Sequence, residues 1–228
     1  MRAFRSTCSM NTLLTFWRST IGKKVVMGVT GLIGLGFVIG HMAGNLQAFS
    51  GAEKLDAYGA LLHGPLHEIV LLSRVVLIIA VILHVVAAYQ LTMISRAARP
   101  IGYVKRAPQV STLASRTLRW GGVLLLAFII FHILHFTIGS VHPDYVSGKV
   151  YQNLATGFAV KWVAFFYLVA MIALGMHLYH GAWSSMRTLG VSKQSAHPLK
   201  RYLPVVLAVV VSTGFAAIPL AFLLGVLR

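Results

Sequence analysis

The chain has 228 residues, of which 57% are hydrophobic and 11% are charged, and its mean hydropathy of +0.80 excludes an ordinary soluble domain. Its formal charge of +16 is carried by basic residues between long apolar runs, which favours membrane-topology signals over a nucleic-acid-binding surface. The single cysteine, Cys8, excludes a disulfide framework and a thiolate-held metal cluster, so any cofactor of this chain is expected to be held mainly by histidine.

The elements predicted in chain order are an amino-terminal segment and five membrane spans. Residues 1–24 are expected to be a retained cytoplasmic or interfacial segment that Trp17 anchors at the membrane surface. A span needs about 20 apolar residues. Five stretches qualify, at about 25–49, 70–94, 121–141, 159–182 and 203–227. Residues 25–228 are therefore predicted to form a single all-α domain, an integral membrane bundle of five transmembrane helices.

The charges of the connecting loops predict the orientation of this bundle. The first loop, 51–69, holds three of the four acidic residues of the chain, namely Glu53, Asp56 and Glu68. The second loop has no acid and six basic residues, which are Arg96, Arg99, Lys105, Arg106, Arg116 and Arg119. Because cytoplasmic loops carry the excess of Lys and Arg, the N-terminus is expected to be cytoplasmic and the C-terminus outside.

Histidines occur at membrane depth in four of the five predicted spans. They are His41 in the first, His84 in the second, His132 and His135 in the third, and His177 and His180 in the fourth. Ionisable residues at this depth are costly and usually mark a function. With a rise of about 1.5 Å per residue, the flanking basic residues place His41 and His132 nearer the outside and His84 and His177 nearer the cytoplasm. Imidazoles paired in this way would ligate two porphyrin irons from opposite sides.

Room for a flat macrocycle provides a second criterion. His177 has small residues at i−4 and i+4, whereas His180 has Met176 and Ser184, so His177 is the better candidate of that pair. In the third span the same criterion points to His135 rather than His132, and the residues alone leave this choice open. A lone membrane histidine is also often a hydrogen-bonded packing residue, and the glycines near His41 also suit close helix packing.

Four short motifs add a family resemblance that covers nearly the whole chain. They are the segments 17–24 (WRSTIGKK), 40–46 (GHMAGNL), 97–100 (AARP) and 177–183 (HLYHGAW), the last followed by Thr-Leu-Gly at 188–190. Together they resemble the membrane-anchor cytochrome b subunit of succinate dehydrogenase (succinate:quinone oxidoreductase, complex II) in its five-helix, di-haem form.

The resemblance implies two b haems with axial ligands at the matching positions. His41 would pair with His132, and His84 with His177, so the resemblance favours His132 over His135. His180 would contact a propionate or a partner subunit. Arg74 is a candidate propionate partner of the outer haem, with a snorkelling topology residue as the equally weighted alternative.

The resemblance also implies partners and a place in an electron-transfer complex. The chain would perform no succinate chemistry itself, but would dock a flavoprotein subunit and an iron–sulfur subunit, which carry FAD and the clusters, against its basic loops 96–119 and 184–201. Electrons would pass to the inner haem, then to the outer haem, and then to a quinone, with menaquinone as the expected type. The expected location is the prokaryotic cytoplasmic (inner) membrane.

The sequence leaves two alternative positions open for the quinone site. The outer loop offers His63, His67 and Glu68, and an inner site would use Arg18, Ser19 and Trp183; these residues carry hydrogen-bonding or stacking groups. The remaining loop histidines, His142 and His197, are expected to be solvated.

Three other functions compete with this interpretation. A proton- or ion-coupled transporter with a histidine relay would need carboxylates within the spans, yet residues 70–140 contain no Asp or Glu. A cytochrome b subunit of another quinone-linked oxidoreductase, such as a hydrogenase, formate dehydrogenase or nitrate reductase, would keep the haems and change the electron donor. A purely structural anchor would leave the paired histidines unexplained.

Overall fold

The computed structural model describes residues 12, 14–98, 113–190 and 198–228, with side chains from 202 onward in the last range. This part of the chain is 87% helix and contains no strand. Its long helices are α2 (Thr20–Asn45), α4 (His67–Ala97), α5 (Leu113–His132), α7 (Lys161–Thr188) and α8 (Pro198–Leu223). The segments Thr20–Ser50, His67–Ala97, Leu113–Ile138, Lys161–Thr188 and Tyr202–Leu223 are long and apolar enough to cross a membrane. The chain is therefore an all-helical, multi-pass membrane protein, and each predicted span falls on one of these helices.

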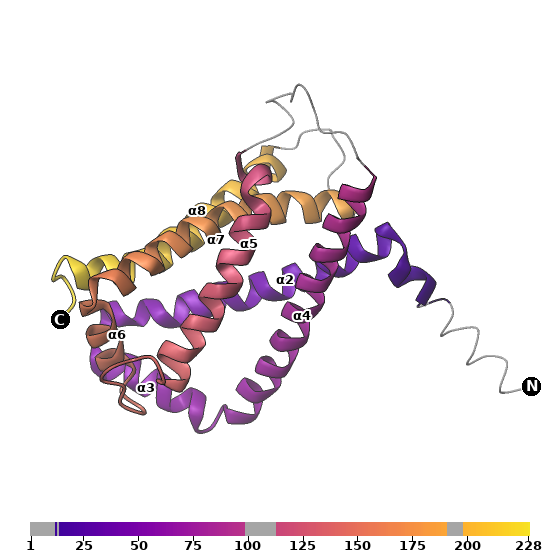
Figure 1. The fold of residues 1–228 in the computed structure, drawn as a ribbon. Helices are drawn as coiled ribbons and strands as arrows, with labels where there is room; N and C mark the ends of the chain where they lie inside the picture. The colour runs from indigo at the N-terminus through magenta and orange to yellow at the C-terminus, as the bar shows by residue number, and fades with distance from the viewer. Residues whose placement is uncertain (1–11, 13, 99–112, 191–197) are drawn as a thin grey trace, which may run out of the picture.

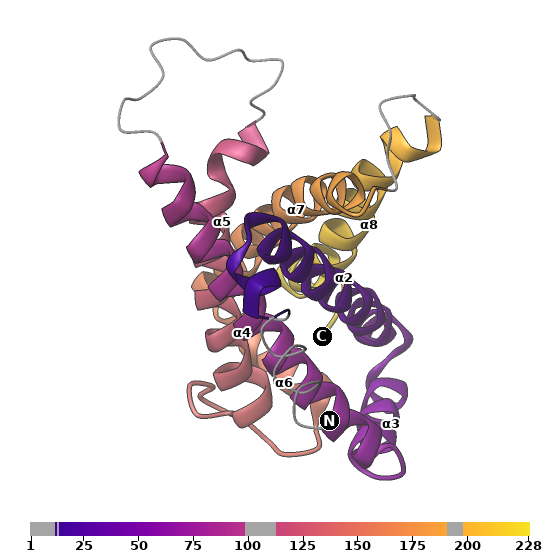
Figure 2. The ribbon, with the colours of Figure 1, turned by 90° about the vertical axis from the view of Figure 1, so that its right-hand side faces the viewer.

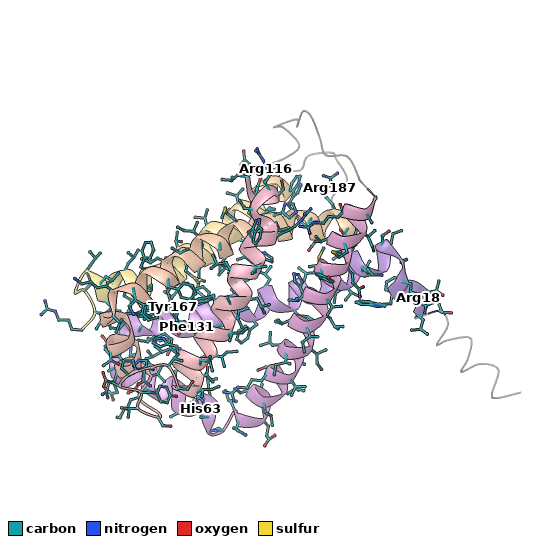
Figure 3. The ribbon with its side chains drawn as sticks, in the orientation of Figure 1. Arg18, His63, Arg116, Phe131, Tyr167 and Arg187 are labelled. Carbon is teal, nitrogen blue, oxygen red and sulfur yellow. The ribbon has the colours of Figure 1, made fainter. Side chains whose placement is uncertain are left out.

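The helices alternate in direction, so charges that are far apart in the sequence gather at the two ends of the bundle (Figure 1). The basic end, where α2, α5 and α8 begin and α4 and α7 end, carries Arg18, Lys23, Lys24, Arg96, Arg116, Arg119 and Arg187. The opposite, acidic end carries all four carboxylates of the chain, Glu53, Asp56, Glu68 and Asp144. Figure 3 shows Arg116 and Arg187 at the first end and His63 at the other.

Three short elements lie at the acidic end, and one of them, α3 (Ala52–His63), corrects the expectation that 51–69 is a loop. A 3₁₀ turn, η1 (Leu46–Ser50), leads into α3, and α6 (Val150–Ala159) precedes α7. In α3 the apolar or small residues Leu55, Tyr58, Gly59 and Leu62 recur with helical spacing, and Leu55 and Gly59 are buried. Figure 2 shows α3 and α6 at the end of the bundle away from the start of α5.

A hydrogen bond between a carboxylate and the backbone connects α3 to α6. Asp56 Oδ1 accepts a hydrogen bond of 2.9 Å from the backbone N–H of Tyr151, in the first turn of α6. The residue before α6, Lys149, makes no side-chain cap, so Asp56 satisfies one of the N–H groups that a helix start leaves unpaired. The acidic loop of the sequence thus has a structural role in addition to its topological one.

The buried apolar core of the described residues lies at the acidic end. Its members come from η1, α3, α6, α7 and α8 and are Ala48, Leu55, Leu154, Phe158, Val163, Ala164, Tyr167 and Ile218. Along their length the long helices expose apolar side chains such as Ile78, Ile82 and Val209, which suits contact with lipid. The short helices therefore brace one end of a bundle whose other surfaces face the membrane.

Helix α5 changes its winding directly after His132. Residues Ile133–Ile138 form a π-helical turn, η2, which ends at Gly139 with a φ of 80°. The ring of Tyr145 packs against Gly139, so a side chain at this position would meet both strain and a clash. Because π-turns inside helices often occur at functional sites, the neighbourhood of His132 is of particular interest.

Candidate functional site

One histidine pair, named the outer pair after its predicted side of the membrane, lies near the acidic end, between α2 and α5. The ring centroids of His41 and His132 are 5.8 Å apart, and the rings are nearly perpendicular, at 81°. Phe37 stacks on His41 at 5.3 Å, and Phe128 stacks on His132 at 5.7 Å. These aromatic neighbours limit the rotation of both imidazoles.

A tyrosine of α7 orients the second histidine of this pair. Tyr167, which is buried, places its hydroxyl oxygen 3.2 Å from Nδ1 of His132. When Nδ1 is engaged in this way, Nε2 remains available as a ligand atom. Metal-binding histidines commonly have their other ring nitrogen fixed by such a hydrogen bond.

The inner histidine pair lies between α4 and α7. The ring centroids of His84 and His177 are 6.0 Å apart, with an interplanar angle of 55°. Nδ1 of His84 lies 3.1 Å from the carbonyl oxygen of Met27 and 3.2 Å from Oγ1 of Thr30. Since a carbonyl can only accept, Nδ1 carries the proton and donates it, and the lone pair is then on Nε2. The neighbouring helix α2 thus fixes the tautomer of His84.

The partner of His84 is a buried polar group that the described part of the chain leaves unsatisfied. Nδ1 of His177 is shielded from solvent and has no hydrogen-bond partner there. Buried polar atoms are nearly always paired, so an orphan calls for an explanation such as an unrecorded ligand or functional role. His177 therefore differs from a histidine retained for packing alone.

Neither histidine pair joins two helices that pack closely on each other. Helix α7 packs against α8, α5 and α2, and α2 packs against α4, but α2 with α5 and α4 with α7 are not among the extensively packed pairs. Closely packed helices have axes about 8–10 Å apart. Each pair of rings thus reaches across the interior of the bundle.

The spacing of the rings fits two imidazoles on opposite sides of one metal ion. Metal–imidazole bonds of about 2 Å, as at zinc, would put the two ligating nitrogens about 4 Å apart and the ring centres roughly 6 Å apart. The observed centroid distances are 5.8 and 6.0 Å. On the same face of α2 as His41, a Cβ added to Gly34 would meet no atom within 4 Å. In ring spacing, the residues present therefore fit one bis-histidine haem at each pair.

The two pairs lie at different depths along the bundle. Gly31 of α2 faces the inner pair, since a Cβ added there would lie 3.4 Å from Cε1 of His84. His41 follows Gly31 by ten residues, and at the helical rise this separation is about 15 Å. The structure thus brings together the two pairs that the depth argument predicts, His41 with His132 and His84 with His177.

The alternative histidine of the third span has other neighbours. His135 is 1% exposed, and its ring stacks on Phe131 at 5.2 Å and on His142 at 4.7 Å. Its Nδ1 lies 3.2 Å from the hydroxyl of Tyr167. Among the described residues, His132 and not His135 has its ring beside His41.

The prediction that His142 is solvated is wrong. Its side chain is 6% exposed, and Nε2 lies 2.9 Å from the carbonyl oxygen of Asn153. The backbone N–H of Asp144 donates to Nδ1 at 3.2 Å. The short helix α6 and the preceding loop cover this histidine, and neither feature is visible from hydropathy. His197 lies outside the described residues.

The other residues proposed for the haem sites are at the surface or beside the pairs. His180 is half-buried on α7, one turn beyond His177, with no hydrogen bond or ring contact to any described residue. Arg74 is exposed on α4, ten residues before His84. By the helical rise Arg74 is therefore about 15 Å from His84 toward the acidic end, which is the depth of His41.

The two candidate quinone sites are at opposite ends of the bundle. His63, His67 and Glu68 are exposed where α3 ends and α4 begins, with Nδ1 of His63 2.8 Å from the carbonyl oxygen of Gly59. At the basic end, Trp183 is 37% exposed on α7.

The remaining inner-site candidates help to hold the start of α2. Ser19 is its N-cap: the hydroxyl accepts from the N–H of Gly22 at 2.9 Å and donates to the carbonyl oxygen of Phe16. The carbonyl oxygen of Arg18 accepts from Nζ of Lys23 at 3.0 Å. Both residues thus have a structural role, which the sequence did not suggest.

Comparison of the chain with known protein families, with curated proteins and with solved structures finds no match in any of the three. The residues and the geometry of the two histidine pairs are therefore the basis for assigning a function.

Proposed function

We propose that this chain is the five-helix, di-haem cytochrome b membrane anchor of a succinate dehydrogenase or fumarate reductase, which passes electrons between flavin and iron–sulfur subunits and a membrane quinone. The observation that carries the proposal is the presence of two histidine pairs, each on two helices that do not pack closely together. The ring centroids are 5.8 Å apart in one pair and 6.0 Å apart in the other. The resemblance of four short motifs to this family supports the choice of enzyme.

In this proposal each pair holds one b haem, and His84 and His132 would ligate through Nε2 because their Nδ1 atoms are hydrogen-bonded. When bound, the haems supply one-electron redox chemistry within the membrane. The chain positions and tunes them: Met27 and Thr30 hold the proton at Nδ1 of His84, while Tyr167 hydrogen-bonds His132. Aromatic rings on the outer pair, such as Phe37 and Phe128, exclude water from its imidazoles.

The distribution of charge supports a definite orientation. The basic end would face the cytoplasm of a prokaryotic cell, with the N-terminus inside and the C-terminus outside. It would there dock the flavoprotein and the iron–sulfur subunit through electrostatic attraction. The quinone, expected to be menaquinone, would bind either at the acidic end, near His63, His67 and Glu68, or at the basic end, near Trp183.

The competing relay function is less well supported by the arrangement of charges. All four carboxylates of the chain lie at the acidic end, in or beside α3, the start of α4 and the loop before α6. Neither histidine pair therefore has a carboxylate partner within the membrane, where a proton relay would need groups that exchange protons.

The test is electron transfer in the complex purified with its partner subunits. Under anaerobic conditions succinate should reduce the b-type absorbance, and a menaquinone analogue should reoxidise it. Absorbance that responds to hydrogen or formate and not to succinate would favour a cytochrome b of another oxidoreductase. A folded complex without b-type absorbance would contradict the proposal and return attention to the relay or the structural anchor.

A further inference from the structure

The hydroxyl of Tyr167 lies between two histidines of the third span. It is 3.2 Å from Nδ1 of His132 and 3.2 Å from Nδ1 of His135. A phenol has a single O–H, so it can donate to one of these nitrogens and must accept from the other. The direction of the two hydrogen bonds is therefore decided by which ring carries its proton on Nδ1.

We infer that Tyr167 is a positioning residue whose hydroxyl oxygen accepts a hydrogen bond from Nδ1–H of His132 and whose O–H donates to Nδ1 of His135, and that it thereby tunes the potential of the outer haem. This inference rests on the proposed function: a His132 that ligates through Nε2 must carry its proton on Nδ1, and donates to the phenol oxygen. The phenol then donates to Nδ1 of His135, whose own proton is on Nε2. His132 thus sets the direction of the two hydrogen bonds, and His135 is the final acceptor.

The surroundings of His135 keep it in place for this role. Its ring is held between Phe131 and His142, and Gly157 of α6 packs against it, with room for no side chain. His142 is itself locked, because both of its ring nitrogens are hydrogen-bonded, to Asp144 and to Asn153. The imidazole of His135, which ends the series of hydrogen bonds from His132, is therefore held in one position by its neighbours, as a precise site requires.

In the inner pair, the hydrogen bond from Nδ1 of His84 goes to a different kind of acceptor. Nδ1 of His84 donates to a backbone carbonyl and a threonine hydroxyl of α2, whereas Nδ1 of His132 donates to a phenol that is shared with a second histidine. A stronger acceptor makes an imidazole a better donor to ferric iron. Tyr167 should therefore affect the potential of the outer haem and leave the inner haem unchanged.

The experiment is a potentiometric titration of both haems in the purified complex of the Tyr167→Phe variant. The outer haem is identified as the one that His41→Ala removes. Loss of the phenol acceptor should raise its midpoint potential and change the low-spin EPR signal of that haem, with the inner haem unaltered. The matched control is Tyr151→Phe at the same end of the bundle, since Tyr151 contacts Phe222 through its ring and its hydroxyl has no hydrogen bond to a described residue. It should change neither potential.

A second variant covers the case in which Tyr167→Phe disturbs folding. His135→Phe keeps an aromatic ring between Phe131 and His142 but removes the acceptor, and should produce a smaller shift of the outer haem in the same direction. Two haems whose potentials are unchanged in both variants, or a shift confined to the inner haem, would overturn the inference and leave the proposed function standing. A wild-type complex without haem would instead overturn the proposed function, and the inference with it.

Discussion

The ring of His135 lies directly against Gly157 of α6, so closely that a Cβ on this glycine would be 2.9 Å from Cε1 of the ring. The same Cβ would lie 3.0 Å from Nε2 of His142. Gly157→Ala should therefore displace the stacked imidazoles and destabilise the chain by about 1–3 kcal/mol, the usual cost of overpacking. Thermal unfolding in detergent would measure the loss.

The matched control for this substitution is Gly36→Ala in α2. A Cβ at Gly36 would meet no atom within 4 Å, and alanine is preferred to glycine in a helix interior by about 1 kcal/mol. This variant should unfold at an equal or higher temperature than the wild type. Equal unfolding temperatures for Gly157→Ala and the wild type would contradict the close packing of α6 on His135.

Gly34→Leu tests whether the space beside α2 belongs to a cofactor. Its Cβ would meet no protein atom within 4 Å, so the protein leaves open space directly beside this glycine. If a porphyrin fills that space, leucine should lower the haem content below two per chain without loss of helical signal by circular dichroism. Gly36→Leu, which is exposed two residues further along, should keep the full content. Equal haem content in the two variants would place the macrocycle elsewhere.

Asp56→Ala should weaken the attachment of α3 to α6. It removes the acceptor of the Tyr151 N–H, and losing such a helix cap costs about 0.5–2 kcal/mol. Asp56→Asn keeps an acceptor oxygen and should cost less, while Glu53→Ala, at an exposed site, should cost little. The order of unfolding temperatures is the measurement, and an unchanged unfolding temperature for Asp56→Ala would show that the contact contributes nothing.

The orientation of the bundle is tested by carboxyl-terminal fusions. Because the basic end is expected to face the cytoplasm, Arg228 should lie outside. A fused alkaline phosphatase, which folds only after export, should be active in a bacterial host, and a fused green fluorescent protein should be dark. The reverse pattern would place the acidic end in the cytoplasm and remove the proposed docking face.

The long helices and the histidine pairing follow from local properties of the sequence. Apolar runs of membrane length identify five helices without any knowledge of packing. The pairing of His41 with His132 and of His84 with His177 follows from distances to flanking charges, because a helix has a constant rise. The choice of His132 beside His41 did not follow from small neighbours, since the winding of α5 changes at Ile133 and alters which residues its turns bring together.

The short elements and the hydrogen-bond partners could not be predicted in the same way. Helices α3 and α6 have 12 and 10 residues, too few for a span, and they are held by contacts with each other and with η1, α7 and α8. The burial of His142 and the hydroxyl contacts of Tyr167 join residues of different elements. Such contacts depend on how the elements pack, and hydropathy does not predict them.

The central claim is that His132 and His177, rather than their neighbours His135 and His180, complete two haem sites with His41 and His84. Pyridine haemochrome quantification on the purified complex tests it most directly. The account predicts two b haems per chain in the wild type, one in each alanine variant of the four paired histidines, and two in His135→Phe and His180→Ala. A wild-type complex without haem, or haem lost with His135→Phe and retained with His132→Ala, would contradict it.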